Sequence, residues 1–171
     1  MSIDKHRLES KDINVRFCVI VTSDKVLQGV YEDRVVPLVS EVLLRHGFSL
    51  SSHSVVPNDR ERIGLIVSNS LASCDVVLLT GGTGLGPRDL SVDVVRDMCT
   101  KDIPGFGELF RYLTYQVHGT AALATRAMAC AVGDRLVFVT PGSTDAVGLA
   151  LEKLILPEVR HLIAELRGLR H

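Results

Sequence analysis

The residues of this chain best suited to holding a phosphate lie together at positions 80–89, which read TGGTGLGPRD. Glycine fills four of the six positions from 81 to 86, so the backbone there can turn sharply and approach a ligand closely. Successive N–H groups in such a loop form a concave surface that binds anions. Arg88 and Asp89 stand side by side at its end, as a site needs if it holds both a phosphate and its Mg²⁺.

A tight connection between a strand and a helix is the alternative explanation for a glycine pair after a strand. The apolar run at 75–79 directly before the loop does predict a buried strand. The loop is, however, longer than a simple turn needs, and it carries Thr80, Thr83, Arg88 and Asp89. These polar side chains favour a ligand-binding loop.

Four aspartates occupy loop or cap positions, where capping of a helix is the commonest role. For Asp33 and Asp59 capping is the favoured interpretation. For Asp24 and Asp89 ligand binding is favoured, because each follows a buried strand within a few residues. Two carboxylates beside a phosphate are costly unless Mg²⁺ joins them, so Asp24 and Asp89 are candidate magnesium ligands.

Two further polar residues leave their roles open. Ser143 follows Pro141-Gly142 and suits either an N-cap or a ligand contact, and a helix N-terminus can serve both. Glu108 follows a tight Pro-Gly-Phe-Gly turn, where it is either a helix-surface residue or a binding residue.

The common nucleotide and hydrolase motifs are absent. No glycine precedes a lysine, as a Walker A loop requires, and Pro87 stands where the third glycine of a dinucleotide fingerprint belongs. There is no G-x-S-x-G nucleophile elbow. The loops also lack a histidine suited to activating water, which argues against a hydrolase.

Alternating strands and helices must position these loops. The apolar patterns predict strands at 15–21, 51–56, 75–80, 126–132 and 135–139. They predict helices at about 34–46, 60–71, 91–99, 104–115, 121–124, 146–154 and 157–166. This order predicts a three-layer α/β/α fold with a mostly parallel sheet and right-handed crossovers.

The three loops at 22–33, 80–89 and 140–143 each follow a predicted strand. Ligands of open α/β sheets bind beyond the carboxyl ends of the strands. If the three strands are parallel, the loops converge on one site, and this convergence carries the functional hypothesis more than any single motif.

Length and composition indicate one globular domain. The chain has 171 residues, of which 46% are hydrophobic and only 5% aromatic, and its net charge is −1. An aliphatic core of this kind suits parallel strands buried on both faces, and the absence of a basic run gives no indication of nucleic-acid binding. We expect a flexible arm at 1–14 and a single domain at 15–171.

The cysteines and histidines indicate neither a metal nor a secreted protein. The four cysteines do not show the spacing of metal ligands, and nor do the six histidines. The cysteines are Cys18, Cys74, Cys99 and Cys130. We therefore expect four reduced core cysteines, a cytoplasmic protein, and no signal peptide or membrane span.

Six pieces of the chain, in order, resemble the MogA, MoaB and gephyrin G-domain family of molybdenum cofactor biosynthesis. They are Val21-Thr22-Ser23-Asp24-Lys25 with Gly29 and Asp33; Val56-Pro57-Asn58-Asp59; Thr80-Gly81-Gly82-Thr83-Gly84 with Arg88-Asp89; Pro104-Gly105-Phe106-Gly107-Glu108; Arg126; and Pro141-Gly142-Ser143. The resemblance extends from about Val15 to Leu166, and the run from Gly107 to Thr114 is most similar to the MoaB branch.

The resemblance implies a molybdopterin adenylyltransferase, which converts ATP and molybdopterin into adenylyl-molybdopterin and pyrophosphate with Mg²⁺. It also implies a homotrimer or homohexamer, with other cofactor-biosynthesis enzymes as further partners. Asp89 and Asp59 are then the expected catalytic residues, and Asp24 and Asp89 the expected magnesium ligands. The residues expected to bind the substrates are Gly81, Gly82, Thr83, Gly84, Arg88, Glu108, Pro141, Gly142 and Ser143 on the nucleotide side and Ser23 and Arg126 on the pterin phosphate side.

The chain departs from the family at three places. Asn58 stands where the family has an acid tied to activity, with Asp59 one position later as its substitute. Ser91-Val92-Asp93 replaces Thr-Pro-Glu, and Thr125-Arg126 replaces Ser-Arg. The first departure keeps a second hypothesis open: an oligomeric molybdopterin-binding or scaffold protein without turnover. Under either hypothesis the finished cofactor carries molybdenum or tungsten.

Overall fold

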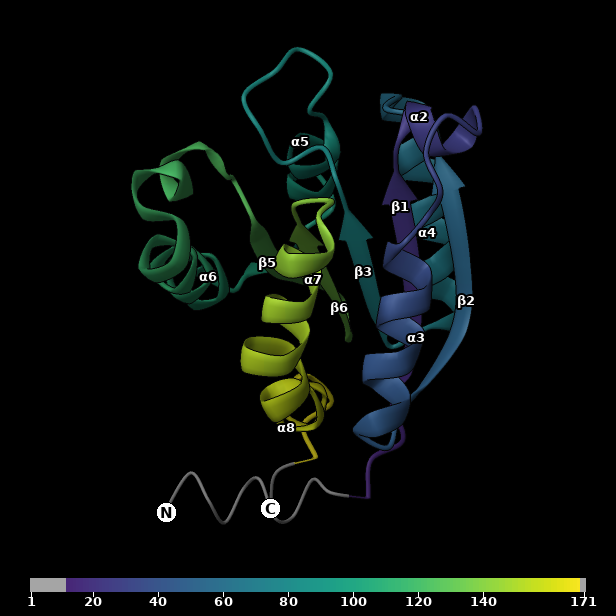
Figure 1. The fold of residues 1–171 in the computed structure, drawn as a ribbon. Coiled ribbons are helices and arrows are strands. Elements are labelled where there is room, and N and C mark those ends of the chain that lie inside the picture. Colours follow the sequence, from purple (N-terminus) through teal and green to yellow (C-terminus); the bar gives the residue numbers. More distant parts are fainter. Residues whose placement is uncertain (1–11, 170–171) are drawn as a thin grey trace.

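A computed structural model describes residues 12–169, which form a three-layer α/β/α domain around a six-stranded sheet (Figure 1). The strand order is β2 (Ser49–Val56), β1 (Arg16–Thr22), β3 (Val76–Thr80), β6 (Arg135–Thr140), β5 (Met128–Val132) and β4 (Lys101–Asp102). Most of the arm predicted at 1–14 lies outside the described residues.

The sheet is mostly parallel, as predicted. Strands β2, β1, β3 and β6 pair in parallel, while β5 pairs antiparallel with β6 and β4 antiparallel with β5. The antiparallel pair follows from the tight turn at Gly133-Asp134, because a two-residue connection can join only antiparallel neighbours.

Side chains alternate between two apolar layers along each central strand, as the period of two requires. On β1, Phe17 and Val19 belong to one core cluster and Cys18 and Ile20 to the other. The first cluster packs against α3 (Val35–Arg45), α6 (Pro104–His118) and a C-terminal helical run. The second packs against α4 (Arg60–Ser73) and α5 (Ser91–Arg96).

The C-terminal helices form a continuous run rather than two separate segments. It consists of α7 (Thr144–Ala150), a π-helical turn η2 (Leu151–Ile155) and α8 (Leu156–Leu166). Pro157 lies in the first turn of α8, where its missing N–H costs little. The helix predicted at 157–166 is thus found as α8, and the π turn joins it to α7 without a break.

Three short elements lie close to the predicted site. A single turn, α2 (Asp24–Leu27), and the two-residue strand β4 were not predicted, because four and two residues are too few for an apolar period to show. The helix predicted at 121–124 is confirmed as a 3₁₀ segment, η1 (Gly119–Ala124).

The prediction of four reduced cysteines was wrong. The structure joins Cys18 to Cys74 and Cys99 to Cys130 in disulfides, with Cα atoms 5.9 and 5.8 Å apart. Partners separated by 56 and 31 residues have no spacing pattern that a sequence could reveal, since the fold alone brings them together.

The amino end of β3 carries a buried ion cluster. Asp75, whose side chain is only 2% exposed, accepts hydrogen bonds from the backbone N–H and the Nε of Arg16 at 2.8 and 3.1 Å, and from Arg135 and Arg167. Burial alone would raise the pKa of Asp75, but the hydrogen bonds from Arg16 and Arg167 hold that pKa well below its usual range. The cluster ties β1, β6 and the C-terminal helix to one carboxylate.

Candidate functional site

Three loops meet at the carboxyl ends of β1, β3 and β6. The N–H of Gly81 donates to the carbonyl of Thr140 at 2.9 Å. A Cβ on Gly81 would lie 2.5 Å from the Thr22 carbonyl oxygen, and a Cβ on Gly142 would lie 3.4 Å from the Gly81 Cα. The three backbones therefore touch, so the loops meet at one edge of the sheet as predicted. The hollow at this edge is lined by residues of the loops after β1 and β6 and by none from 80–89, so the expectation that all three loops form one site is only partly met.

The glycine loop needs glycine at its first two positions for reasons of both conformation and space. Gly81 and Gly82 have φ angles of +92° and +68°, a region that side chains with a Cβ disfavour. A Cβ on Gly82 would also lie 2.5 Å from the Oγ of Ser91. Leu90 is the N-cap of α5, and the buried hydroxyl of Ser91, the first residue of that helix, lies 3.3 Å from the hydroxyl of Thr22.

The loop offers backbone donors to a ligand. Gly81 has already committed its N–H to Thr140, whereas within residues 12–169 no acceptor contacts the N–H groups of Gly82, Thr83 or Gly84. Consecutive unpaired N–H groups of this kind form an anion-binding concavity. The N–H of Gly81 is therefore not available to a ligand, and the predicted set of donors from Gly81 to Gly84 is reduced to Gly82, Thr83 and Gly84.

Asp89 closes the far end of the loop. Its Oδ2 accepts the N–H of Gly86 at 2.8 Å, and its own N–H donates to the Gly86 carbonyl at 3.0 Å. The carboxylate therefore caps a turn at 86–89 through one oxygen and keeps acceptor capacity on the other.

Asp24 is the centre of a second polar cluster. Its carboxylate accepts hydrogen bonds from the backbone N–H and the Nδ2 of Asn58, both at 3.1 Å, and pairs with Arg88 at 2.7 Å. The hydrogen bond from the Asn58 side chain is the largest cause that lowers the pKa of Asp24. Burial opposes it, and the backbone hydrogen bond from Asn58 and the charge of Arg88 add smaller lowering effects. Arg88, which is 71% exposed, thereby joins the glycine loop to the loop after β1.

Arg126 points at the glycine loop. Its Nε donates to the Gly84 carbonyl at 2.9 Å, its Nη2 to the Asp89 carbonyl at 2.8 Å, and its Nη1 to Asp93 at 2.9 and 3.1 Å. The hydrogen bond from Arg126 lowers the pKa of Asp93, on α5. All three guanidinium nitrogens therefore have partners within the chain.

Four predicted polar residues are N-caps or cap-like acceptors. Ser23 caps α2 and Ser143 caps α7, each accepting an N–H at 3.2 Å. Asp59 caps α4 by accepting the N–H of Arg62 at 2.9 Å, and Asp33 accepts the N–H groups at the start of α3. The favoured interpretation of Asp33 and Asp59 as capping residues is confirmed.

The site residues line more than one cavity. Ser23, Gly142 and Ser143 line a hollow of about 550 Å³ between the loops after β1 and β6. Pro141 and Ser143 border a smaller apolar hollow of about 320 Å³ beside α6 and α7. Ser143 thus connects two neighbouring hollows at the same edge of the sheet.

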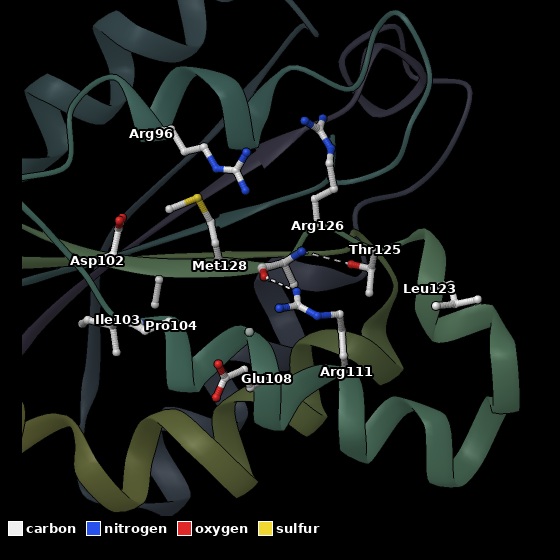
Figure 2. A pocket seen from close by; sticks show the side chains of 13 residues that line it. Arg96, Asp102, Ile103, Pro104, Glu108, Arg111, Leu123, Thr125, Arg126 and Met128 are labelled. Atoms are coloured by element: carbon white, nitrogen blue, oxygen red, sulfur yellow. Dashed lines mark hydrogen bonds between the residues drawn. The ribbon is translucent and has the colours of Figure 1, made fainter.

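A third hollow, of about 460 Å³, lies between α5, α6 and β5 and contains Glu108 and Arg126 (Figure 2). Arg126 and Glu108 lie on opposite sides of it, with Arg111 between them (Figure 2). Arg111 donates to the Ala127 carbonyl at 3.0 Å. Glu108 and Arg126, which the resemblance assigns to different substrates, therefore border one hollow.

Several residues of these clusters were not predicted as functional. Arg96 belongs to no motif, and Asn58 and Asp93 were noted only as departures from the family pattern; the fold brings Asn58 to Asp24 and Asp93 to Arg126. Among the described residues, no group of three or more His, Cys, Asp or Glu side chains is arranged to hold a metal ion. Within the same range, no helix has the length and apolar character needed to cross a membrane.

A mostly parallel sheet with a glycine loop and an acid–base cluster at its carboxyl edge defines an α/β ligand-binding protein of the open-sheet class. Residues 18–161 match the family described as "Probable molybdopterin binding domain". The chain is 38% identical over 173 residues to molybdenum cofactor biosynthesis protein B of Bacillus subtilis, and the match covers 98% of each protein. It is 37% identical to the protein of the same name from Staphylococcus epidermidis, over 95% of this chain and 96% of that one.

Solved structures agree. The crystal structure of a molybdenum cofactor biosynthesis protein B has a TM-score of 0.86 at 37% identity, covering 91% of this chain and 98% of that one. The tungsten cofactor synthesizing protein MoaB from Pyrococcus furiosus has a TM-score of 0.83 at 34% identity, covering 90% and 98%. The chain therefore belongs to the MogA/MoaB family of molybdenum cofactor biosynthesis proteins, on the MoaB branch.

Proposed function

We propose that this protein is a molybdopterin adenylyltransferase, which joins ATP and molybdopterin to give adenylyl-molybdopterin and pyrophosphate. The single observation that carries the proposal is the meeting of three loops at one edge of the sheet, where the N–H groups of Gly82, Thr83 and Gly84 have no acceptor among residues 12–169. Unpaired donors at the carboxyl edge of a parallel sheet suit a polyphosphate. The family description supports molybdopterin as one substrate, and ATP as the other is what the sequence resemblance implies.

The nucleotide phosphates lie against the glycine loop in this proposal. Gly82, Thr83 and Gly84 donate their N–H groups, and Arg88 adds a mobile positive charge from an exposed position. Pro141, Gly142 and Ser143 form the facing wall, where the N-terminus of α7 also favours negative charge.

Molybdopterin lies on the other side of the transferred phosphoryl group. Arg126, on the pterin side, borders the hollow between α5, α6 and β5 together with Glu108. Ser23, also expected on the pterin side, borders the hollow between the loops after β1 and β6 together with Gly142 and Ser143 of the nucleotide wall. In this proposal the two substrates therefore meet across both hollows rather than occupying one each.

The residues present fit a magnesium ion that arrives with the nucleotide. Mg²⁺ in such sites is held by one or two carboxylates together with substrate phosphates and water, so a cage made by the protein alone is not required. Asp89 keeps one carboxylate oxygen for this role, and Asp24 becomes available when Arg88 turns toward a phosphate. When bound, the ion would neutralise part of the charge between the two anionic substrates.

No general base is needed, because the attacking phosphate oxygen of molybdopterin is already ionised near neutral pH. Catalysis then depends on holding two anions in line and on donors that face the developing charge. The chain's own contribution is the glycine-loop donors, the charge of Arg88 and the fixed carboxylate of Asp24. Asp59 caps α4 next to Asn58. In this proposal it is also a catalytic residue, in place of the acid that the family has at position 58.

We place the protein in the cytoplasm as a single-domain homotrimer or homohexamer, with other cofactor-biosynthesis enzymes as partners. The oligomeric state and the partner enzymes rest on the resemblance to the family. The cytoplasmic location was expected in part from reduced cysteines, and the two disulfides remove that support, because disulfides are rare in cytosolic proteins.

A scaffold that binds molybdopterin without turnover is the second candidate, and the Asn58 contact favours it. Asn58 donates to both oxygens of Asp24, and Arg88 supplies a positive charge to the same group. The carboxylate is thus satisfied without a metal ion.

The deciding experiment incubates the purified protein with ATP, MgCl₂ and molybdopterin and measures pyrophosphate and the adenylylated product by mass spectrometry. We expect product formation, and a strong loss of it in Asp89→Ala. Asp97→Ala is the matched control, because Asp97 pairs with Arg60 on the surface at the end of α5. Molybdopterin binding without pyrophosphate release would establish the scaffold instead.

A further inference from the structure

The Arg126 side chain donates its hydrogen bonds to the glycine loop and to Asp93, so none of its guanidinium nitrogens is left without a partner to bind a ligand. Its side chain donates to the carbonyls of Gly84 and Asp89, and its backbone N–H donates to the carbonyl of Thr83 at 2.9 Å. One residue thus holds three carbonyl groups of the loop.

These contacts determine which way the loop's donors point. In a planar trans peptide the C=O and the following N–H point in opposite directions. Because the carbonyls of Thr83, Gly84 and Asp89 face residue 126, the N–H groups of residues 84, 85 and 90 face away from it. The loop consequently has an acceptor side against Arg126 and a donor side opposite.

Asp93 holds the guanidinium in place. Both carboxylate oxygens of Asp93 accept from Nη1 of Arg126, at 2.9 and 3.1 Å. Asp93 lies on α5, a helix that packs in the second core cluster. The Arg126 side chain is 25% exposed, and its guanidinium is held between α5 and the glycine loop. A planar fork with several partners is a geometry that lysine cannot reproduce.

We infer that Arg126 and Asp93 are positioning residues, which orient the far half of the glycine loop so that the N–H groups of Gly84 and Leu85 face a phosphate. In this arrangement Arg126 acts on the ligand through the loop backbone. The inference deepens the proposed function and rests on it for the identity of the ligand, whereas the orientation of the loop is a property of the protein alone.

The test compares Arg126→Lys, Asp93→Asn and the control Asp97→Asn, which makes the same charge change in a surface pair with Arg60. The first measurement is the NMR order parameter of the Leu85 and Leu90 amides in the free protein. We expect values near those of a rigid backbone, roughly 0.85, in the wild type and the control, and values falling toward about 0.6 in the other two variants. Unchanged order in both variants overturns the inference, whatever the protein does with nucleotides.

The second measurement is the affinity for Mg²⁺–ATP by titration calorimetry. If Arg126 positions the loop, Asp93→Asn and Arg126→Lys each weaken binding by about tenfold, the factor that corresponds to about 1.4 kcal/mol. If Arg126 binds phosphate itself, Asp93→Asn frees its guanidinium and tightens binding, and Arg126→Lys, which keeps the charge, stays near the wild type. That opposite sign overturns the inference.

The two measurements separate this inference from the proposed function. Loss of loop order in both variants, in a wild type that binds no ATP, supports the positioning role and removes the proposed function. Normal ATP binding in the wild type, with unchanged loop order in both variants, supports the proposed function and removes the positioning role. Far-UV circular dichroism of each variant ensures that only folded protein is compared.

Discussion

The two ends of the central strands carry very different aspartates. At the amino end, Asp75 is 2% exposed and bound by three arginines. Beyond the carboxyl end of β1, Asp24 is 23% exposed and held by one amide side chain and one exposed arginine. The first aspartate joins elements of the fold, while the second is ion-paired with an arginine whose side chain is mostly exposed to solvent.

A disulfide strengthens the same contrast. Cys74, the residue before Asp75, is joined to Cys18 of β1, so the amino end of β3 is fixed both covalently and by charge. The loops at the carboxyl end are joined to each other by backbone hydrogen bonds and by the Asp24–Arg88 pair. Local stability is therefore concentrated away from the candidate site, as is usual where loops must admit a ligand.

The largest effect that would sharpen the contrast is expected from Asp75→Ala. It leaves three arginines beside a buried gap, and removal of one partner of a buried ion pair costs about 3–5 kcal/mol. The free energy of unfolding, measured by urea titration, should fall by that amount. Asp97→Ala, which breaks the exposed pair with Arg60, should cost less than about 1 kcal/mol. Equal losses in the two variants would show that burial of Asp75 is irrelevant.

The acid limb of stability should follow Asp75 as well. Its folded pKa lies below its unfolded value of about 3.9, so its contribution is complete above that pH and is lost as the pH falls toward the folded pKa. The difference in unfolding free energy between wild type and Asp75→Asn should therefore shrink as the pH falls from about 5 to about 2. Urea titrations at several pH values measure it, and a constant difference would contradict the argument.

At the carboxyl end, Gly82→Ala should have an intermediate effect on stability. The backbone there has φ +68°, and the new Cβ would meet the Ser91 hydroxyl at 2.5 Å. Strain of this kind costs about 1–3 kcal/mol. The control is Gly105→Ala, since a Cβ on Gly105 meets nothing within 4 Å. A Gly82→Ala protein as stable as the control would mean that the loop adapts readily.

Much of the fold could be predicted from the sequence because its signals are local. Strong apolar runs marked β1, β3 and β6, and Asp59 marked the start of α4 with an ordinary N-cap pattern. The glycine loop could be recognised because glycine at positive φ leaves a residue-type signature, as at Gly81 and Gly82.

The contacts that distinguish the two ends could not be predicted, because they join residues far apart in the chain. Asn58 lies 34 residues from Asp24, Asp93 lies 33 from Arg126, and Arg167 lies 92 from Asp75. Their side-chain types are common on protein surfaces, so the sequence carries no mark of the partner. The predicted role of Arg126 toward the pterin phosphate came from the resemblance alone, and the structure shows contacts to the loop backbone.

The smallest effect on stability is expected from Asp24→Ala, and it is the variant that most directly tests the contrast. The Asp24 contacts with Asn58 and Arg88 are partly exposed, so their loss should cost about 1 kcal/mol or less of unfolding free energy. The same change removes a carboxylate from the proposed magnesium and phosphate site, so pyrophosphate release should fall far more than stability does. Urea titration and the pyrophosphate assay on one preparation give both numbers. If Asp24→Ala loses several kcal/mol of unfolding free energy, Asp24 stabilises the fold as Asp75 does, and the contrast between the two ends of the strands is wrong.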